Sequence, residues 1–138
     1  MKENELTPNE EDYIEMIYRL QIENENENVK IKDLSNALNI KPSSVSNMVK
    51  RLQEKELLKH ELYGSINLSE LGYDMGKKFL ERHNTIYEFL KIIGLDKYLH
   101  EETEKIEHTI SLDTLVKIKK LINFFKDNKD ILEKFKLY

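Results

Sequence analysis

The sequence predicts a mainly α-helical protein whose first half contains one small pair of strands. Apolar residues recur three and four positions apart over most of the 138 residues, which is the spacing of amphipathic helices. A different pattern occurs at 57–68, where two short apolar runs flank Tyr63-Gly64-Ser65. This arrangement is typical of a two-stranded hairpin. We therefore expect helices throughout, apart from this hairpin.

The first helix is predicted from a helix-start signal. Thr7 suits the N-cap, Pro8 suits the first helical position and Glu10 completes a capping box. Helical apolar spacing then continues to about Ile22. The polar stretch 23–28 ends the helix and is expected to be a solvated connector.

Two further helices and a tight turn follow the connector. A short helix is expected over 33–38, a turn over 39–41, and a third helix from Pro42 to Leu52. Helix, short turn and helix form the helix–turn–helix pattern, and the hairpin after them makes a wing. We therefore predict a winged-helix domain over 1–70 that binds double-stranded DNA.

The second half reads as helical throughout. A long helix begins at Ser69 and closes at Gly94, and an acidic helix holds Glu104. Ser111 or Asp113 then caps a further helix, and the tail 127–135 suits one more short helix. The predicted second domain is all-helical and spans 71–138.

Composition narrows the chemistry. The sequence has no cysteine, so any metal must be bound by oxygen or nitrogen donors. No apolar run reaches about 18 residues, and the first residues lack the pattern of a signal peptide. We therefore expect no membrane association and a cytoplasmic location. Although the net charge is −4, the region 41–60 is basic, with five Lys and Arg against two Glu. A basic region of this kind suits binding to phosphates.

The DNA-reading residues are predicted from the helix–turn–helix. The exposed N-terminal part of its second helix faces the major groove. Small hydroxyls permit close approach, Asn pairs with adenine, and Lys and Arg neutralise phosphates. The predicted contacts are Lys41, Pro42, Ser43, Ser44, Ser46, Asn47, Lys50, Arg51, Lys59 and Tyr63. The alternative is that the serines only cap a helix and the basic residues decorate a solvated face.

A cluster of carboxylates and imidazoles suggests a metal site. Glu104, Glu107 and His108 project from one helix face because their spacing is three and four. Asp12 and Glu15 form a second pair, and His83 lies on a third helix. Each has a structural alternative: a solvated acidic face, first-turn acids or a core histidine. His60 and His100 fit no cluster and are left out of the predicted site.

Several segments resemble the DtxR/MntR family of metal-dependent transcriptional regulators, and within it the manganese-type branch. They cover the chain from about Thr7 to the 120s, in the family's order. The matching segments are Glu11-Asp12-Tyr13-Ile14-Glu15, Pro42-Ser43-Ser44-Val45-Ser46-Asn47-Met48-Val49, Arg82-His83, Phe89-Leu90-Lys91-Ile92-Ile93-Gly94 and Ile106-Glu107-His108.

The resemblance implies a winged-helix domain followed by a helical dimerisation domain, acting as a homodimer on a palindromic operator. It implies metal-ligand roles for Asp12, Glu15, His83, Glu104, Glu107 and His108. Asp12 and Glu104 stand where the iron-type relatives carry Met and Cys, and we expect no SH3-like third domain; both points favour the manganese branch. Carboxylate oxygens suit Mn(II), and four of them allow two ions per subunit; Fe(II), Co(II), Zn(II) and Cd(II) also fit such donors.

The expected function is manganese-activated DNA binding that represses metal-uptake genes. Two alternatives remain at this point. A winged-helix regulator that ignores metal and senses an organic ligand or a protein partner would carry the acidic cluster as a solvated rim. A binuclear metallohydrolase would use the same donors, but it leaves the winged helix unexplained and lacks an anion-binding glycine loop.

Overall fold

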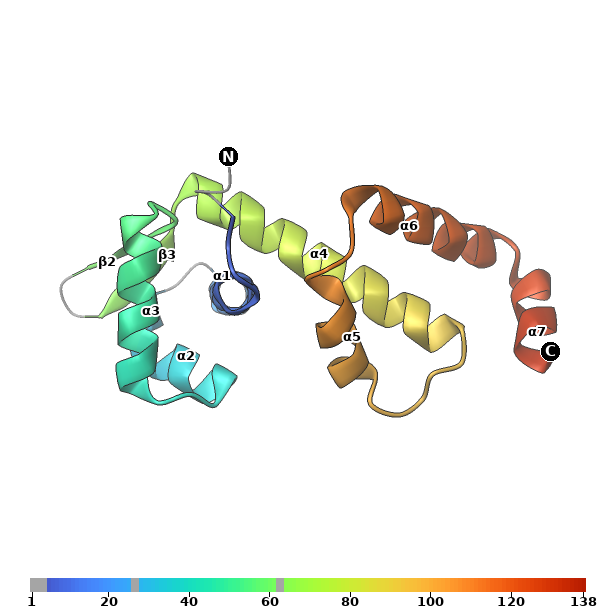
Figure 1. The fold of residues 1–138 in the computed structure, drawn as a ribbon, viewed down its shortest axis with the longest axis horizontal. Helices are drawn as coiled ribbons and strands as arrows, with labels where there is room; N and C mark the ends of the chain where they lie inside the picture. Colours follow the sequence, from blue (N-terminus) through green and yellow to red (C-terminus); the bar gives the residue numbers. More distant parts are fainter. Residues whose placement is uncertain (1–4, 26–27, 62–63) are drawn as a thin grey trace. The chain divides into compact units, whose positions relative to one another are not determined.

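The computed structural model describes residues 5–25, 28–61 and 64–138, and most of them are helical (Figure 1). The described elements include three short strands. The mainly helical fold class is confirmed. In chain order the elements are α1 (Pro8–Glu23), β1 (Val29–Lys30), α2 (Ile31–Leu38), α3 (Pro42–Glu54), β2 (Leu58–His60), β3 (Ser65–Leu68), α4 (Glu70–Ile92), α5 (Leu99–Glu107), α6 (Leu112–Asp127) and α7 (Lys129–Leu137).

The chain forms two compact units that divide inside α4. The N-terminal unit extends to Leu80, and the C-terminal unit begins at Glu81. Across the described ranges, no helix combines the length and apolar character needed to cross a bilayer. Each unit is described separately below.

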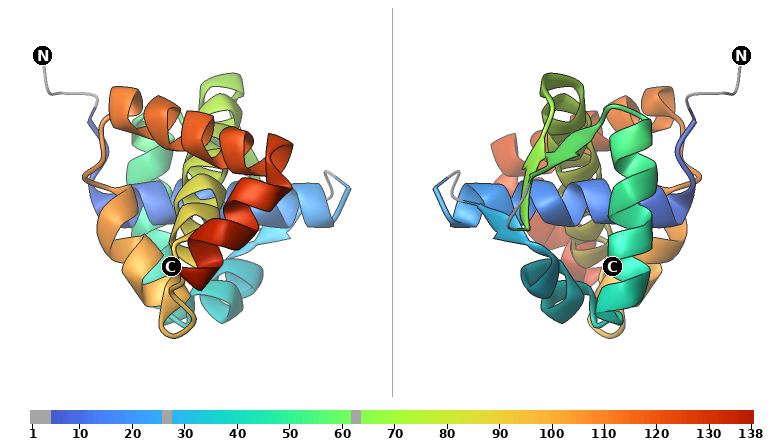
Figure 2. Two further views of the ribbon diagram at one scale, coloured as in Figure 1. Left: turned by 90° about the vertical axis from the view of Figure 1, so that its right-hand side faces the viewer. Right: turned by 90° about the vertical axis from the view of Figure 1, so that its left-hand side faces the viewer.

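The N-terminal unit contains a small antiparallel sheet of three strands rather than two. Its order is β1-β3-β2, with Val29 opposite Ile66 and His60 also opposite Ile66 on the other side. The strand β1 was not predicted, because it has only two residues and its partner lies far along the chain. Figure 2 shows the strands with the helices of this unit.

The core of the N-terminal unit joins one face of each helix to the sheet. Buried apolar side chains contact one another in a single cluster of Tyr13, Ile14, Ile17, Val29, Leu34, Val45, Met48, Val49, Leu52, Leu57, Leu58 and Ile66. The first turn of α4 packs closely against this core at Gly72, where an added Cβ would lie 2.0 Å from the Leu57 carbonyl oxygen. Only glycine allows that approach, so Gly72 determines how α4 leaves the sheet.

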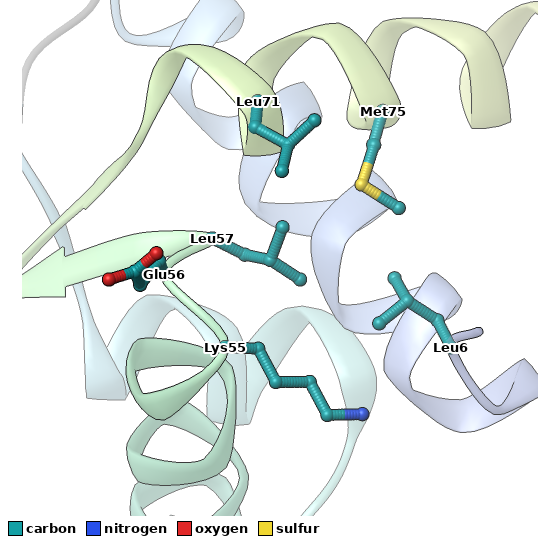
Figure 3. A pocket seen from close by; sticks show the side chains of 6 residues that line it. All are labelled: Leu6, Lys55, Glu56, Leu57, Leu71 and Met75. Atoms are coloured by element: carbon teal, nitrogen blue, oxygen red, sulfur yellow. The ribbon is translucent and has the colours of Figure 1, made fainter. Parts of the chain in front are cut away.

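A hollow of about 400 Å³ opens beside the C-terminal end of α3 (Figure 3). Its walls are mostly apolar and come from the segment before α1, the segment directly after α3 and the first turns of α4. The lining residues are Leu6, Lys55, Glu56, Leu57, Leu71 and Met75. The lining includes none of the predicted DNA contacts.

The C-terminal unit has a smaller apolar core. Ile86, Leu90 and Leu115 form its buried cluster. The helix α4 ends as predicted at Gly94, whose φ of +105° permits a Schellman closure: Leu95 N–H donates to the Leu90 carbonyl at 3.0 Å, and Gly94 N–H to that of Lys91 at 3.2 Å.

The cap that begins α6 is Ser111, one of the two predicted alternatives. Its hydroxyl accepts the Thr114 backbone N–H at 3.2 Å. The helix leaves four large apolar side chains exposed: Leu112, Val116, Leu121 and Phe124. The tail forms the helix α7, as the sequence suggested.

Candidate functional site

The turn between α2 and α3 positions the predicted DNA-reading helix. Asn39 closes α2 in the left-handed conformation, with φ 55°, which a short polar side chain tolerates. Ile40 N–H donates to the Ser35 carbonyl at 3.1 Å, and the Ser35 hydroxyl donates to the Ile40 carbonyl. Pro42 then occupies the first helical position of α3. The predicted helix–turn–helix is therefore present, with a three-residue turn.

The helix α3 separates into a buried face and an exposed face. Its core face is Val45, Met48, Val49 and Leu52. The predicted DNA contacts in the described part of the chain are all exposed, namely Lys41, Pro42, Ser43, Ser44, Ser46, Asn47, Lys50, Arg51 and Lys59. Tyr63, the remaining predicted contact, lies outside the described residues. An exposed polar face of this composition suits a DNA groove.

A second, shallower hollow separates α1 from the exposed face of α3. It encloses about 300 Å³, and Asn9 and Tyr13 of α1 face Ser44, Asn47 and Arg51 of α3 across it. Burial raises the pKa of the Tyr13 hydroxyl, so this side chain is neutral at neutral pH. The helix α1 therefore contributes directly to the surroundings of the DNA-reading face.

In the C-terminal unit, α4 and α5 bring two imidazoles and two carboxylates together. His83 Nδ1 lies 2.7 Å from Glu107 Oε2 and 3.5 Å from Glu104 Oε1. His108 Nε2 lies 3.4 Å from Glu107 Oε1 and 3.9 Å from Glu104 Oε2. The 2.7 Å separation of His83 Nδ1 and Glu107 Oε2 is a hydrogen-bond distance, in which a protonated Nδ1 is the donor and the carboxylate oxygen the acceptor.

Glu107 is the buried centre of this cluster. It is 0 % exposed, whereas the Glu104 side chain is 33 % exposed. Among the described residues, Glu107 Oε1 has no hydrogen-bond partner although it is fully buried. A buried carboxylate oxygen without a partner is costly unless a cation compensates its charge. These nitrogen and oxygen donors therefore fit a divalent metal ion.

The local structure around His108 differs slightly from the prediction. The helix α5 ends at Glu107, and His108 forms its C-cap with helical backbone angles. The side chain still lies beside Glu104 and Glu107 because that backbone continues the helical direction for one residue. Arg82 Nη2 lies 3.3 Å from His108 Nδ1, opposite the nitrogen that faces the carboxylates.

His100, predicted to lie outside every cluster, lies beside two of the predicted ligands, so that prediction is wrong. His100 Nε2 lies 3.7 Å from Glu104 Oε1, and its ring centroid lies 5.5 Å from that of His83. His83, His100 and Glu104 each offer one donor atom, and these atoms lie within 4.8 Å of one another. The spacing of four between His100 and Glu104 on one helix was the available signal. His100 is thus a further candidate ligand, although its side chain is 67 % exposed.

Asp12 and Glu15 lie in α1 of the N-terminal unit, one turn apart and therefore on the same side of the helix. Glu15 pairs with Arg19 Nη2 of the next turn at 2.8 Å. Asp12 is half-buried. Their part in a metal site stays a prediction.

The chain belongs to the iron-dependent repressor family. Residues 5–66 match the family's N-terminal DNA-binding domain, and residues 69–136 match its metal-binding and dimerisation domain. The resemblance inferred from the sequence motifs is therefore confirmed. Members of this family are DNA-binding regulators rather than enzymes, so the metallohydrolase hypothesis falls.

Among individual relatives, the chain is similar to the HTH-type transcriptional regulator MntR of Listeria welshimeri. The two are 40 % identical over 131 residues, which cover 94 % of this chain and 91 % of that protein. MntR of Shouchella clausii is 39 % identical over 124 residues, covering 89 % of this chain and 85 % of that protein.

Solved structures of manganese regulators share the fold. The manganese regulator SloR matches with a TM-score of 0.72 at 28 % identity, over 86 % of this chain and 55 % of that chain. A manganese-dependent transcriptional repressor in complex with manganese matches with a TM-score of 0.73 at 25 % identity, over 83 % of this chain and 53 % of that one. This chain therefore spans about half the length of those two proteins.

Proposed function

We propose that this protein is a manganese-activated transcriptional regulator that binds DNA as a homodimer and represses metal-uptake genes when Mn(II) is plentiful. The observation that carries the proposal is Glu107, a fully buried carboxylate flanked by two imidazoles and a second carboxylate, with one oxygen lacking a hydrogen-bond partner among the described residues. A divalent cation would compensate the charge of such a group, and the same chain presents an exposed DNA-reading helix.

The metal ligands that we assign are His83, Glu104, Glu107 and His108 of the C-terminal unit, completed by Asp12 and Glu15 of α1. Support for the first four is their mutual geometry. Support for Asp12 and Glu15 is their spacing on α1 and the resemblance to the manganese-type branch. The four carboxylates have room for two ions per subunit, with Glu side chains as bridges.

Manganese is the metal that the donor types favour. Carboxylate oxygens with two imidazoles suit a hard divalent ion, and the sequence contains no thiolate that would select a softer one. Mn(II) binds most weakly in the divalent series, so Fe(II), Co(II), Zn(II) and Cd(II) also bind such a site. Selectivity then comes from coordination number and geometry.

The chain's own residues explain why a cation would change DNA binding. A bound divalent ion supplies the positive charge that the clustered carboxylates lack. Without it, the carboxylates repel one another, and this disfavours any arrangement that brings them together. When that repulsion is removed, α1 is restrained, and α1 packs against the DNA-reading α3 through Tyr13 and the shared core.

A homodimer is supported by exposed apolar side chains on α6. Leu112 is 76 % exposed and Val116, one turn further on, is 52 % exposed, and Leu121 and Phe124 are also exposed later in the helix. An apolar patch of this kind on a folded unit is typical of an interface. Two copies would present two α3 helices to a palindromic operator whose half-sites lie one helical turn apart or a multiple of it. We propose a cytoplasmic location, because a regulator of this kind must reach genomic DNA.

The proposal is tested by titrating a labelled duplex with protein in excess Mn(II) and again with chelator. The duplex comes from upstream of this gene or of a manganese transporter gene, and a scrambled duplex is the control. We expect specific binding only with Mn(II), with an affinity gain of about 5- to 150-fold. Equal specific binding in both conditions would favour the metal-independent regulator, and no specific binding in either would contradict the DNA-binding assignment for these sequences.

A further inference from the structure

Glu10 is a buried acidic residue that belongs neither to the proposed metal ligands nor to the predicted DNA contacts. It lies in the first turn of α1, inside the N-terminal unit, and is 0 % exposed. Glutamate is rarely buried completely unless it is paired. The pairing of Glu10 is therefore informative.

The two carboxylate oxygens of Glu10 have different partners. Oε1 accepts the Thr7 backbone N–H at 3.0 Å, which closes the predicted capping box. Oε2 lies 2.7 Å from Lys55 Nζ and 3.7 Å from Arg51 Nη2. Lys55 is the C-cap of α3 and Arg51 lies in its last turn. One side chain thus begins α1 and also ties it to the end of the DNA-reading helix.

The charge pairing goes beyond what a helix cap needs. A capping box uses one side-chain oxygen at the third helical position, and an amide oxygen of Gln performs that task equally well. Burying a full negative charge stabilises the fold only when cations compensate it, as Lys55 and Arg51 do here. The carboxylate also lies 3.7 Å from the Arg51 guanidinium, a predicted phosphate contact that is 55 % exposed.

The position of Glu10 on α1 connects it to regulation. Glu10 and Asp12 are two residues apart, which separates them by about 200° around the helix axis. The proposed ligand Asp12 and the α3 anchor Glu10 therefore lie on opposite sides of α1. A rigid helix transmits a restraint on one side to groups on the other.

We propose that Glu10, through Lys55 and Arg51, is the positioning residue that couples metal-dependent restraint of α1 to the placement of the DNA-reading helix α3. The inference rests on the proposed function, because it presumes that metal changes the affinity for DNA. Glu10 itself binds neither metal nor DNA. Loss of Glu10 therefore changes the coupling between Mn(II) binding and DNA binding, rather than the affinity for Mn(II) or DNA alone.

The test measures that coupling directly. Glu10→Gln keeps an oxygen for the cap and removes the charge, and Lys55→Gln removes the partner from α3. For each variant, the operator affinity is measured in excess Mn(II) and in chelator, and Mn(II) affinity is measured without DNA by calorimetry. We expect the ratio of the two operator affinities to fall about three- to tenfold in both variants. Mn(II) affinity without DNA stays unchanged.

Matched variants separate positioning from simpler effects. Glu54→Gln and Lys32→Gln remove one exposed charge of each sign from the same unit and leave the ratio unchanged. Lys55→Arg keeps the cation, so its ratio of operator affinities should stay within about twofold of the wild-type ratio. The double variant Glu10→Gln/Lys55→Gln loses no more than either single variant, since both remove one interaction.

The contradicting outcomes are distinct from one another. A lower melting temperature with an unchanged ratio would leave Glu10 only its capping role and overturn the proposal. An equal fall in the ratio in Glu54→Gln or Lys32→Gln would attribute the effect to net charge and overturn it too. A wild-type protein without any Mn(II) dependence would overturn the proposed function, and with it this coupling.

Discussion

The two units of this protein achieve stability in different ways. The N-terminal unit has a buried apolar cluster of twelve residues drawn from helices and sheet. The buried cluster of the C-terminal unit has three residues, and His83 and Glu107 are buried in the same unit. Both units bury titratable groups, Glu10 and Glu15 in the first and His83 and Glu107 in the second, but only the first combines them with a large apolar cluster.

The difference matches the tasks that we assign to the units. A DNA-reading helix must be held rigidly, and a large apolar core provides that. A sensor must respond to its ligand, and a buried carboxylate such as Glu107 can make the stability of its unit depend on a cation. Ligand binding to the folded state stabilises it by mass action, so the C-terminal unit is where metal should act on stability.

The sharpest test of this comparison is Glu107→Gln. The substitution keeps the shape of the side chain and removes the buried charge, so the metal-free protein should melt at the same temperature as the wild type or higher. Mn(II) at about 100 times its dissociation constant stabilises the wild type by about 2.7 kcal/mol, and the variant should lose this gain. Thermal denaturation with and without Mn(II) measures both effects, and a full Mn(II) response in the variant would remove Glu107 from the ligand set.

Gly72→Ala in the N-terminal unit should lower the stability of the protein and leave Mn(II) binding unchanged. The added Cβ would meet the Leu57 carbonyl oxygen at 2.0 Å, so the backbone must shift. Overpacking of this kind costs about 1–3 kcal/mol. Urea denaturation should report this loss, while calorimetry should show unchanged Mn(II) affinity. Gly64→Ala is a control for the loss of a glycine without a steric clash, because nothing lies within 4 Å of its added Cβ, although its φ of +83° adds backbone strain.

Acid should weaken the N-terminal unit through Glu10. Burial by itself raises the pKa of the Glu10 carboxyl, but hydrogen bonds from Lys55 and Thr7 outweigh it, and the net pKa lies below its ordinary value of 4.5. A lowered folded-state pKa adds stability that is present above pH 4.5 and is lost as the pH falls through the folded pKa. The free energy of unfolding of the metal-free wild type should exceed that of Glu10→Gln by about 1–2 kcal/mol at pH 7. In acid the two free energies should become equal. A constant difference across urea titrations from pH 7 to acid would contradict this.

The smallest effect is expected from His100→Asn. The imidazole is 67 % exposed and 3.7 Å from Glu104, so it lies at the open edge of the buried cluster. Calorimetry should show Mn(II) affinity within about twofold of the wild type, because this exposed imidazole lies outside the set of donors assigned to the ion. A tenfold loss would add His100 to the manganese ligands. His60→Asn, which alters a histidine of the N-terminal unit, is the matched control.

The local features of this protein were determined by sequence alone. The capping box of Thr7 and Glu10, the turn at Asn39 and the closure of α4 at Gly94 depend on residues within one or two helical turns, and all are present. The exposed face of α3 follows from apolar periodicity in the same way. The association of Glu104 with Glu107 and His108 needed only helical spacing.

Tertiary structure alone decided which distant groups meet. Chain folding brings β1 beside β3, Lys55 beside Glu10 and His83 beside Glu107, and no local pattern encodes those distances. It also brings His100 near His83, although the prediction left His100 out of the site. The physical reason is that helix formation is governed by neighbours a few residues away, whereas burial and ion pairing depend on which surfaces the whole core brings together.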